Sequence, residues 1–359
     1  MKWVFDNATV LYGEDLEIVK GYIVVKDGVI EEVGGGSYRG RKTDVKRGII
    51  LPAFTNSHVH LGDSVAKDIG TYRSIVERVG KEGIKHRILK EKKSEVPRAM
   101  QATLKEMLSS GTTAFCDFRE GGLDGIEELK SALKSPLDSL ILGRPDSDEP
   151  EELLRHCDGI GISSIGDYTE EELKTISKGV KKDNKLLGIH VAEVEDDTDK
   201  ALALNPSFVV HLTNASEDGL EKIAKAKIPV VLCPRANAML GVGMPRFKEI
   251  FDSNLVALGT DNVMVNSPNM FREMEFTFKA IRGLYKDYTF NAKEVLKAAT
   301  INGRKIFGLK DNAIREGNDA DFVVVKKGKY LSDPLVALVH RAENSDVKFV
   351  VKGDILSPE

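Results

Sequence analysis

Cysteine is scarce in this chain of 359 residues, and long apolar runs are missing. The three cysteines, Cys116, Cys157 and Cys233, are too few and too scattered for a disulfide framework or a cysteine-based metal motif, which favours a reducing compartment. The sequence does not open with a basic stretch followed by an apolar one, so no signal peptide is predicted. No apolar run approaches the roughly 18 residues that a membrane span needs. These absences predict a cytoplasmic protein.

An excess of positive charge is missing as well. The net charge of -4 and the isoelectric point near 6.1 give no reason to expect nucleic acid or a membrane surface as a partner. The hydrophobic content of 41% and the mean hydropathy of -0.23 indicate a globular protein. A chain of this length accommodates one barrel of about 250 residues together with a smaller unit.

Histidine is also rare, and its placement is informative. Four of the seven histidines, His58, His60, His190 and His211, lie at or near the ends of short apolar runs that are typical of strands, and Asp261 ends another such run. His58 and His60 are two positions apart, so on a strand both side chains point to the same face. Neutral imidazoles and a carboxylate together bind a borderline metal ion and leave a position for water.

These apolar runs alternate with helical patterns, which favours a parallel sheet closed into a barrel. Polar groups at the ends of buried strands are typical of a (β/α)₈ barrel, whose catalytic groups gather at the C-terminal face. The clearest helical patterns, three of which begin with a capping residue, are Glu95–Ser109, Thr169–Lys182, Ser216–Lys225 and Asn291–Ala299.

Six short segments follow one another in an order that resembles a known enzyme superfamily. They are Pro52–His60, Ser110–Asp117, His190–Glu193, Cys233–Asn237, Gly259–Asp261 and Ala299–Gly303. Together they resemble the amidohydrolase superfamily, in the branch of cytosine-deaminase-like and chlorohydrolase-like enzymes that includes the S-adenosylhomocysteine, adenosine and guanine deaminases. Ala236 stands where that branch usually has serine. The resemblance covers nearly the whole chain.

The resemblance implies an α/β fold of two domains. A TIM-type (β/α)₈ barrel would span residues 51–309, and a small β-sandwich would be built from both chain ends, residues 1–50 and 310–359. The sequence itself shows that both ends are rich in short β segments, with a hairpin signal at Lys26–Gly28. By the same resemblance, the highly charged segment 63–94 is a candidate lid over the active site.

The resemblance also assigns roles to the candidate site residues. His58, His60, His190 and Asp261 would hold a metal ion that lowers the pKa of bound water toward about 7. Asp261 would take a proton from that water, and His211 would hold the attacking hydroxide or polarise the substrate. Glu193 would protonate a ring nitrogen and later the leaving amine.

The resemblance favours one divalent ion. Binuclear relatives bridge two ions with a carboxylated lysine late in the fourth strand, and the segment Gly159–Gly166, which is predicted to be that strand, contains no lysine. Zinc is the expected ion, with iron as the alternative, because the ligand types do not separate the two firmly.

Substrate contacts are harder to predict. Arg119 and Arg235 each follow a predicted strand, so each would grip an anionic substrate group or serve as a structural ion-pair partner. Asp117 and Glu120 are close enough in sequence to neutralise Arg119. Asn237 would contact substrate or cap a turn.

The favoured function is hydrolytic deamination of an amino-substituted heterocycle, such as a nucleobase or nucleoside, with release of ammonia. The alternatives are a hydrolase of a cyclic amide or formimino compound, as in imidazolonepropionase-like relatives, and a metal-binding homologue without activity. The expected partner is a small-molecule substrate. Substrate identity and oligomeric state, including a homo-oligomer, stay open.

Overall fold

The computed structural model of the chain describes residues 1–80, 82–146, 148–326, 328 and 331–357. Residue 81 of the predicted lid, and residues 327, 329, 330, 358 and 359 of the predicted sandwich, lie outside the described residues. The chain forms two compact units. One consists of Met1–Thr55, Glu106–Ala114 and Asn269–Glu359, and the other of Asn56–Lys105 and Phe115–Pro268. The predicted domain boundaries after residues 50 and 309 stay a prediction.

The predicted barrel is present as a nine-stranded sheet in the order β13-β12-β11-β10-β9-β8-β7-β6-β14. Its strands are β6 (Phe54–His60), β7 (Thr112–Arg119), β8 (Asp138–Gly143), β9 (Gly159–Ile162), β10 (Leu186–Val191), β11 (Phe208–His211), β12 (Val230–Leu232), β13 (Val256–Leu258) and β14 (Asp261–Asn262). β13 and β14 are successive pieces of residues 256–262. Because β13 pairs with β12 and β14 pairs with β6, both in parallel, the sheet closes into a ring.

The step between β13 and β14 is fixed by buried side-chain contacts. The backbone N–H of Thr260 donates to Asn56 Oδ1 at 3.0 Å, and Asn56 Nδ2 donates to Thr260 Oγ1 at 2.7 Å. A Cβ atom on Gly259 would lie 2.6 Å from the Cβ of His58. The chain therefore needs glycine here, because any side chain would collide with the first strand.

Every residue of β6, β7, β9 and β11 is buried, as expected of strands covered on both faces. Inside the barrel, the Phe118 ring occupies space beside two glycines, and a Cβ on Gly161 or Gly188 would come within 2.6 Å of it. Such interlocking of large and small residues fills a barrel interior.

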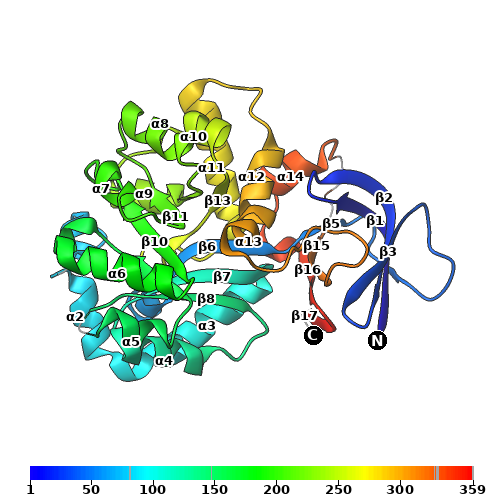
Figure 1. Cartoon of the computed structure of the whole chain (residues 1–359). Coiled ribbons are helices and arrows are strands. Elements are labelled where there is room, and N and C mark those ends of the chain that lie inside the picture. Colours follow the sequence, from blue (N-terminus) through cyan, green and yellow to red (C-terminus); the bar gives the residue numbers. More distant parts are fainter. Residues whose placement is uncertain (81, 147, 327, 329–330, 358–359) are drawn as a thin grey trace. The chain divides into compact units, whose positions relative to one another are not determined.

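Helices surround this ring in Figure 1. They include α4 (Gly122–Ala132), α5 (Pro150–Leu154), α6 (Glu170–Lys182), α7 (Thr198–Leu202), α8 (Glu217–Lys225), α9 (Pro234–Leu240) and α10 (Phe247–Ser253). The predicted capping box of α6 is confirmed. Thr169 Oγ1 accepts from the Glu172 N–H at 3.3 Å, and Glu172 Oε2 accepts from the Thr169 N–H at 2.6 Å. Ser216 caps α8 in the same position as predicted.

The segment after the His-x-His strand forms short helices. They are η1 (Leu61–Ala66), α1 (Ile75–Val79), α2 (Ile84–Glu91) and η2 (Lys93–Glu95), followed by α3 (Val96–Ser109). Apolar contacts hold them, since Val79, Ile84 and Ile88 pack around buried Ala66 and Met264. The segment is therefore an ordered part of the barrel unit.

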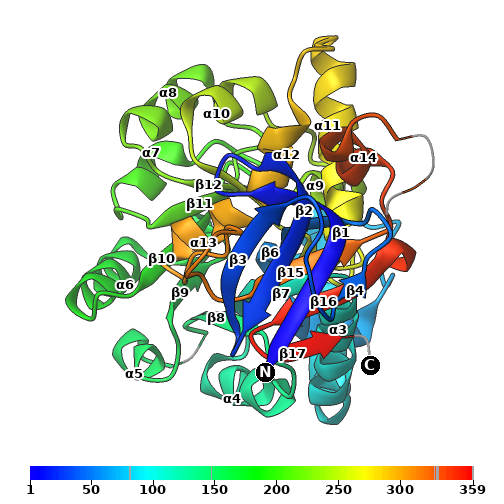
Figure 2. The same ribbon diagram turned by 90° about the vertical axis from the view of Figure 1, so that its right-hand side faces the viewer.

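The other unit contains an eight-stranded sheet built from both chain ends, as predicted. Figure 2 shows the blue N-terminal strands beside the orange and red C-terminal ones. The order is β17-β16-β15-β5-β1-β2-β3, with β4 paired to β1. The strands are β1 (Lys2–Tyr12), β2 (Glu17–Lys26), β3 (Val29–Gly35), β4 (Thr43–Asp44), β5 (Ile49–Pro52), β15 (Asp321–Val325), β16 (Val347–Lys352) and β17 (Ile355–Ser357).

The same unit also contains α11 (Met270–Tyr285), α12 (Ala292–Ala299), α13 (Ile301–Phe307) and α14 (Pro334–His340). The predicted helix at 291–299 is confirmed as α12, with the Asn291 side chain accepting from the Lys293 N–H. None of the described helices is both long enough and apolar enough to cross a membrane.

Candidate active site at the barrel mouth

The strand ends place the predicted metal ligands in one ring. His58 and His60 lie near and at the end of β6, His190 is the penultimate residue of β10, His211 ends β11, and Asp261 begins β14. The chain turns sharply at two of these residues, since φ is +80° at His211 and +60° at Asp261. A positive φ costs a non-glycine residue about 1–3 kcal/mol, and such strain is concentrated at functional sites.

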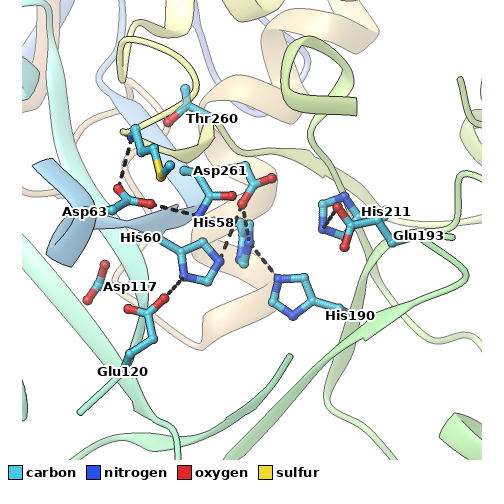
Figure 3. Close-up of polar contacts among 12 residues, drawn as sticks. His58, His60, Asp63, Asp117, Glu120, His190, Glu193, His211, Thr260 and Asp261 are labelled. Atoms are coloured by element: carbon cyan, nitrogen blue, oxygen red, sulfur yellow. Dashed lines mark hydrogen bonds and ion pairs between the residues drawn. The ribbon is translucent and has the colours of Figure 1, made fainter. Parts of the chain in front are cut away.

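The side chains converge as Figure 3 shows. His58, His190, His211 and Asp261 are all buried, and each offers a ligand atom within 4.8 Å of the others. His58 Nε2 lies 3.2 Å from Asp261 Oδ1 and 3.2 Å from His190 Nε2. His60 joins the group from the same strand, with its Nε2 3.4 Å from Asp261 Oδ1.

The donor atoms fit a divalent metal ion. His211 Nε2 is buried and has no hydrogen-bond partner among the residues that the structure describes. Burial lowers the pKa of His58 to about 4 and holds that of His190 well below its usual value, so both rings are neutral and carry a lone pair. Although burial disfavours its charge, Asp261 stays ionised, because the His58 hydrogen bond and nearby histidines hold its pKa well below the usual range. Neutral imidazoles around a carboxylate suit zinc and similar ions.

Contacts behind the rings fix their orientation. His190 Nδ1 lies 2.8 Å from the carbonyl oxygen of Ile162, and His60 Nδ1 lies 3.0 Å from Glu120 Oε1. Each ring therefore has a partner at Nδ1 and directs Nε2 toward the centre, as histidine ligands do.

His211 is held in the same manner. Its Nδ1 lies 2.9 Å from Asn237 Oδ1, and Asn237 Nδ2 donates to Thr213 Oγ1 at 2.9 Å. Asn237 is fully buried and does not line the cavity described below. The geometry therefore does not support the predicted contact between Asn237 and substrate. It indicates instead that Asn237 holds the His211 ring in place.

Glu193 lies beside this group at the mouth of the barrel. Its Oε1 is 3.8 Å from His211 Nε2, and 20% of its side chain is exposed. Burial raises the pKa of Glu193 above its usual value. A raised pKa is the direction that the predicted proton shuttle needs.

A cavity of about 1000 Å³ opens over the metal ligands. His60, His190, Glu193 and Asp261 line its floor, and α1 and α2 supply one wall through residues that include Ile75, Val76, Val79, Lys85 and His86. Arg144, the residue after β8, lines it as well. The segment predicted to cover the site therefore does border it.

Arg119 and Arg235 are placed differently from the prediction. Arg119 is buried, its Nε donates to the Gly125 carbonyl at 2.9 Å, and its Nη2 lies 3.4 Å from Glu128 Oε2. Arg235 Nη1 donates to the Ser267 carbonyl at 3.2 Å. Neither lines the cavity, so their contact with substrate stays a prediction without support from these contacts. Arg144 does line the cavity. The feature of the sequence that could have indicated it is its place directly after the apolar run of β8.

Sequence reasoning also missed a cluster of buried charges behind His60. Asp63 accepts from Asn262 Nδ2 at 2.9 Å and from the Met264 N–H at 3.0 Å. Asp117 accepts from the Leu61 N–H at 2.6 Å, and burial raises the pKa of Asp117 to about 6. Lys85 approaches both Asp63 and Glu120. These carboxylates fix the loop that follows the His-x-His strand.

Three histidines and an aspartate at the strand ends of a closed parallel barrel, with a carboxylate beside them, form a site typical of metal-dependent hydrolases. The sequence model of the amidohydrolase family matches residues 49–356, and the chain belongs to this family. The resemblance inferred from the motifs is thereby confirmed, and the chain is a hydrolase that acts on carbon–nitrogen bonds.

Similar proteins agree with this assignment. An uncharacterized protein of Methanocaldococcus jannaschii is 36% identical over 94% of each chain. The 5-methylthioadenosine/S-adenosylhomocysteine deaminase of Pyrococcus abyssi is 25% identical over 96% of this chain and 91% of its own length. The solved structure of an adenosine deaminase from Xanthomonas campestris with bound zinc matches with a TM-score of 0.78 at 16% identity, covering 99% of this chain and 94% of that one. This last likeness shows the shared fold.

Proposed function

We propose that the protein is a mononuclear metal-dependent deaminase, which hydrolyses an amino-substituted heterocycle such as a nucleobase or nucleoside and releases ammonia. One observation carries the proposal: Glu193 lies 3.8 Å from His211 Nε2, at the edge of a buried histidine and aspartate cluster, and lines one cavity together with His190 and Asp261 of that cluster. The deaminase names of the Pyrococcus relative and of the zinc-containing Xanthomonas structure support it.

His58, His60, His190 and Asp261 would hold the metal, which is most simply one zinc ion. When bound, such an ion supplies Lewis acidity and lowers the pKa of coordinated water toward about 7. The number of ions follows from the fourth barrel strand, since β9 and the residues up to Gly166 offer no lysine that could be carboxylated to bridge a second ion.

The protein's own groups divide the proton transfers. Asp261, whose pKa is held low, accepts the proton of the attacking water. Glu193, whose pKa is raised, carries a proton to the ring nitrogen next to the reacting carbon, which makes that carbon more electrophilic. Glu193 is then reprotonated with the proton that Asp261 took from the water and delivers it to the departing amine, because an amine leaves as ammonia and not as an amide anion. The second proton of the water, released as the carbonyl forms, restores the protonated Glu193.

His211 has a role that depends on its tautomer. If the Asn237 amide oxygen accepts from Nδ1–H, Nε2 offers a lone pair and suits a metal ligand. If the Asn237 amide is turned, Nε2–H is a donor and holds the attacking oxygen. We assign His211 the second role and His60 the fourth place among the ligands.

The volume and the lining of the cavity limit the size of the substrate and the places where a charged substrate group can bind. A volume of about 1000 Å³ is at the upper end for small-molecule sites and accommodates a nucleoside. The lining carries nine carboxylates and three cationic side chains, Lys85, Arg144 and Lys200, and Lys85 already contacts two carboxylates. An anionic substrate group, which the sequence predicted, would therefore bind at Arg144.

The proposal is tested by ammonia release from zinc-loaded protein over a panel of purines, pyrimidines, pterins and triazines, each offered with and without an anionic substituent. The Glu193→Gln variant is the control for contaminating activity. Ammonia from one compound class, absent in the variant, supports the deaminase. Opening of a cyclic amide such as an imidazolone, with no deamination in the panel, would favour the alternative hydrolase. A zinc-loaded protein that turns over neither class would be the inactive homologue.

A further inference from the structure

Lys85 is a lysine in an unusual place. It lies on α2, two residues after Gly83, and only 2% of its surface is exposed. A fully buried ammonium group is costly unless carboxylates compensate its charge, and lysine is almost never buried without such partners. The residues around Lys85 must therefore explain its position.

Two buried carboxylates meet this ammonium group. Lys85 Nζ forms a close ion pair with Glu120 Oε1 and lies 3.4 Å from Asp63 Oδ2. Glu120 follows the end of β7, whereas Asp63 belongs to η1, just after the His-x-His strand. Lys85 thus joins α2 to the ends of two neighbouring barrel strands.

The oxygen atom that binds Lys85 also contacts a proposed metal ligand. Glu120 Oε1 lies 3.0 Å from His60 Nδ1, a contact drawn in Figure 3. The other oxygen, Oε2, lies 3.8 Å from Arg119 Nη1. Glu120 therefore lies between two cations. Burial alone would favour its protonated form, but Lys85 and His60 hold the pKa of Glu120 well below its usual value.

An ionised carboxylate can only accept hydrogen bonds. The hydrogen bond between Glu120 and His60 therefore requires the proton of a neutral His60 ring to be on Nδ1. The lone pair is then on Nε2, the atom that faces Asp261 at 3.4 Å. Without Lys85, Arg119 at 3.8 Å would be the remaining cationic neighbour of Glu120. Movement of the carboxylate toward Arg119 would leave His60 Nδ1 without its acceptor, and the ring proton could then move to Nε2.

We propose that Lys85 is a positioning residue, which holds Glu120 in place behind His60 so that His60 keeps its proton on Nδ1 and directs Nε2 toward a metal ion. Because His60 is a ligand only in the proposed function, the metal part of this inference rests on that proposal, while the tautomer part does not. Lys85 also lines the cavity, so its ion pair with Glu120 links the α2 wall to the support of His60.

α2 has other anchors, which allows Lys85 to be tested without loss of the fold. Ile84 and Ile88 pack into the apolar cluster around Met264. In the preceding helix α1, buried Arg78 donates to the carbonyl oxygens of Ile69 and Met264 at 3.0 and 3.3 Å. Lys85→Met removes the charge and keeps most of the side-chain volume. Lys85→Arg keeps the charge. Lys90→Met, at an exposed position of the same helix, is the matched control.

The first measurement is made on metal-free protein with ¹⁵N-labelled histidine. The ring nitrogens of His60, identified by their loss in His60→Ala, should report the Nδ1–H tautomer in the wild type and in Lys90→Met. Lys85→Met should shift them toward the Nε2–H form or toward a mixture, and Lys85→Arg should restore the wild-type pattern. Glu120→Gln, which removes the acceptor-only carboxylate, should give the same shift and serves as the second variant if Lys85→Met does not fold.

The second measurement is the rate at which zinc-loaded protein loses its metal to a chelator. Lys85→Met should lose zinc about 10- to 100-fold faster than the wild type, which is the usual effect of removing a partner behind a histidine ligand. Lys90→Met should match the wild type. Wild-type ring shifts and a wild-type zinc-loss rate in Lys85→Met would overturn the inference. A wild-type protein that binds no divalent ion would overturn the proposed function, and the ring shifts would still decide the role of Lys85.

Discussion

At the residue scale, the site contains imidazoles that burial prevents from carrying charge. His58 and His190 are kept uncharged by burial, and Asp261 is kept charged by the histidines around it. A core that is apolar or fully hydrogen-bonded leaves no buried Nε2 without a partner. His211 differs from this, since its buried Nε2 has no hydrogen-bond partner among the residues that the structure describes. The arrangement is therefore suited to a ligand that accepts lone pairs.

The assignment of His60 and His211 can be tested by metal content. His60→Ala should lose most bound zinc, because it removes a proposed ligand, whereas His211→Ala should keep zinc and lose activity. His156→Ala is the control, since that side chain is 42% exposed and contacts Glu152. Metal content is measured by atomic emission on purified protein. Zinc retained by His60→Ala and lost by His211→Ala would identify the ligand set as His58, His190, His211 and Asp261.

Glu193→Gln tests the proton shuttle. The amide keeps the size of the side chain but cannot transfer a proton, so zinc content should be unchanged while kcat falls about 10²- to 10⁴-fold, the usual contribution of a positioned acid–base group. Glu221→Gln, the same substitution at an exposed position outside the cavity lining, is the control. The readout is steady-state ammonia release together with zinc content, and near wild-type turnover by Glu193→Gln would exclude the shuttle role.

The sequence allowed a prediction of which strand-end residues would meet at the barrel mouth, but not of the contacts behind them. His58, His190 and Asp261 stand at the ends of recognisable strands, and strand ends of a parallel barrel meet at one face whatever the details of packing. Glu120 and Lys85 are 35 positions apart, and no local pattern pairs them. Arg119 also ends a strand, yet its side chain turns to Gly125 and Glu128, because strand position does not decide where a long side chain finds its hydrogen bonds.

At the element scale, helices with strong caps could be predicted closely, because capping depends on residues within one turn. The expected helix at 169–182 is α6, with Thr169 as its N-cap. The segment 63–94 gave no such signal, since α1 and α2 are short and depend on apolar contacts with residues near Met264. Short helices of this kind are stabilised by tertiary packing and not by their own sequence.

The N-cap of α6 predicts that two Thr→Ala substitutions in and next to this helix change the free energy of unfolding differently. Thr169→Ala removes the side chain that accepts from the Glu172 N–H, and it should lower the free energy of unfolding by about 0.5–2 kcal/mol. Thr175→Ala, on the exposed face of the same helix, replaces a residue of low helix propensity with alanine and should leave stability unchanged or slightly raised. Urea unfolding of both variants is the measurement, and equal losses would contradict the capping argument.

The loop after β10 gives a pH-dependent contribution to stability. Asp196 accepts from the Thr198 N–H at 3.1 Å and the Ser216 N–H at 2.9 Å, and so joins the starts of α7 and α8. Burial opposes its charge, but these hydrogen bonds lower the pKa of Asp196 to about 2. A lowered folded-state pKa stabilises the protein above the unfolded-state value near 4 and ceases to do so as the pH falls through about 2.

Asp196→Asn should therefore lower the free energy of unfolding by about 1 kcal/mol at pH 7, a value reduced by solvent screening of this exposed group, and should have no effect near pH 2. Glu195→Gln removes the same charge one residue earlier and is the control. The unfolding midpoint in urea is compared at both pH values. A loss that is the same at pH 7 and pH 2 would show that the carboxylate charge does not matter.

At the scale of the whole molecule, ring closure brings together residues that are about 200 positions apart. β14 pairs with β6, so Asp261 comes next to Val59 and within reach of both histidines of the first strand. The order of motifs along the chain therefore allows the site to be predicted. The cavity cannot be predicted in this way, because its wall comes from α1, α2 and the residues after β8 and β9, whose positions are set by packing over the whole barrel unit.

Because the proposed ligands come from the first, fifth and last strands of the barrel, metal binding should stabilise the closed ring. Purified protein should bind about one zinc ion per chain, and free zinc at 1000 times its dissociation constant should add about 4 kcal/mol to the stability of the folded form. The midpoint of thermal unfolding should then rise with zinc concentration and fall on chelation. Asp261→Ala, which lacks a ligand from the last strand, should show neither shift. A stoichiometry near two, with a modified lysine at the site, would contradict the single-ion proposal. A midpoint that does not respond to zinc would show that the three strands that carry the proposed ligands are held together without it.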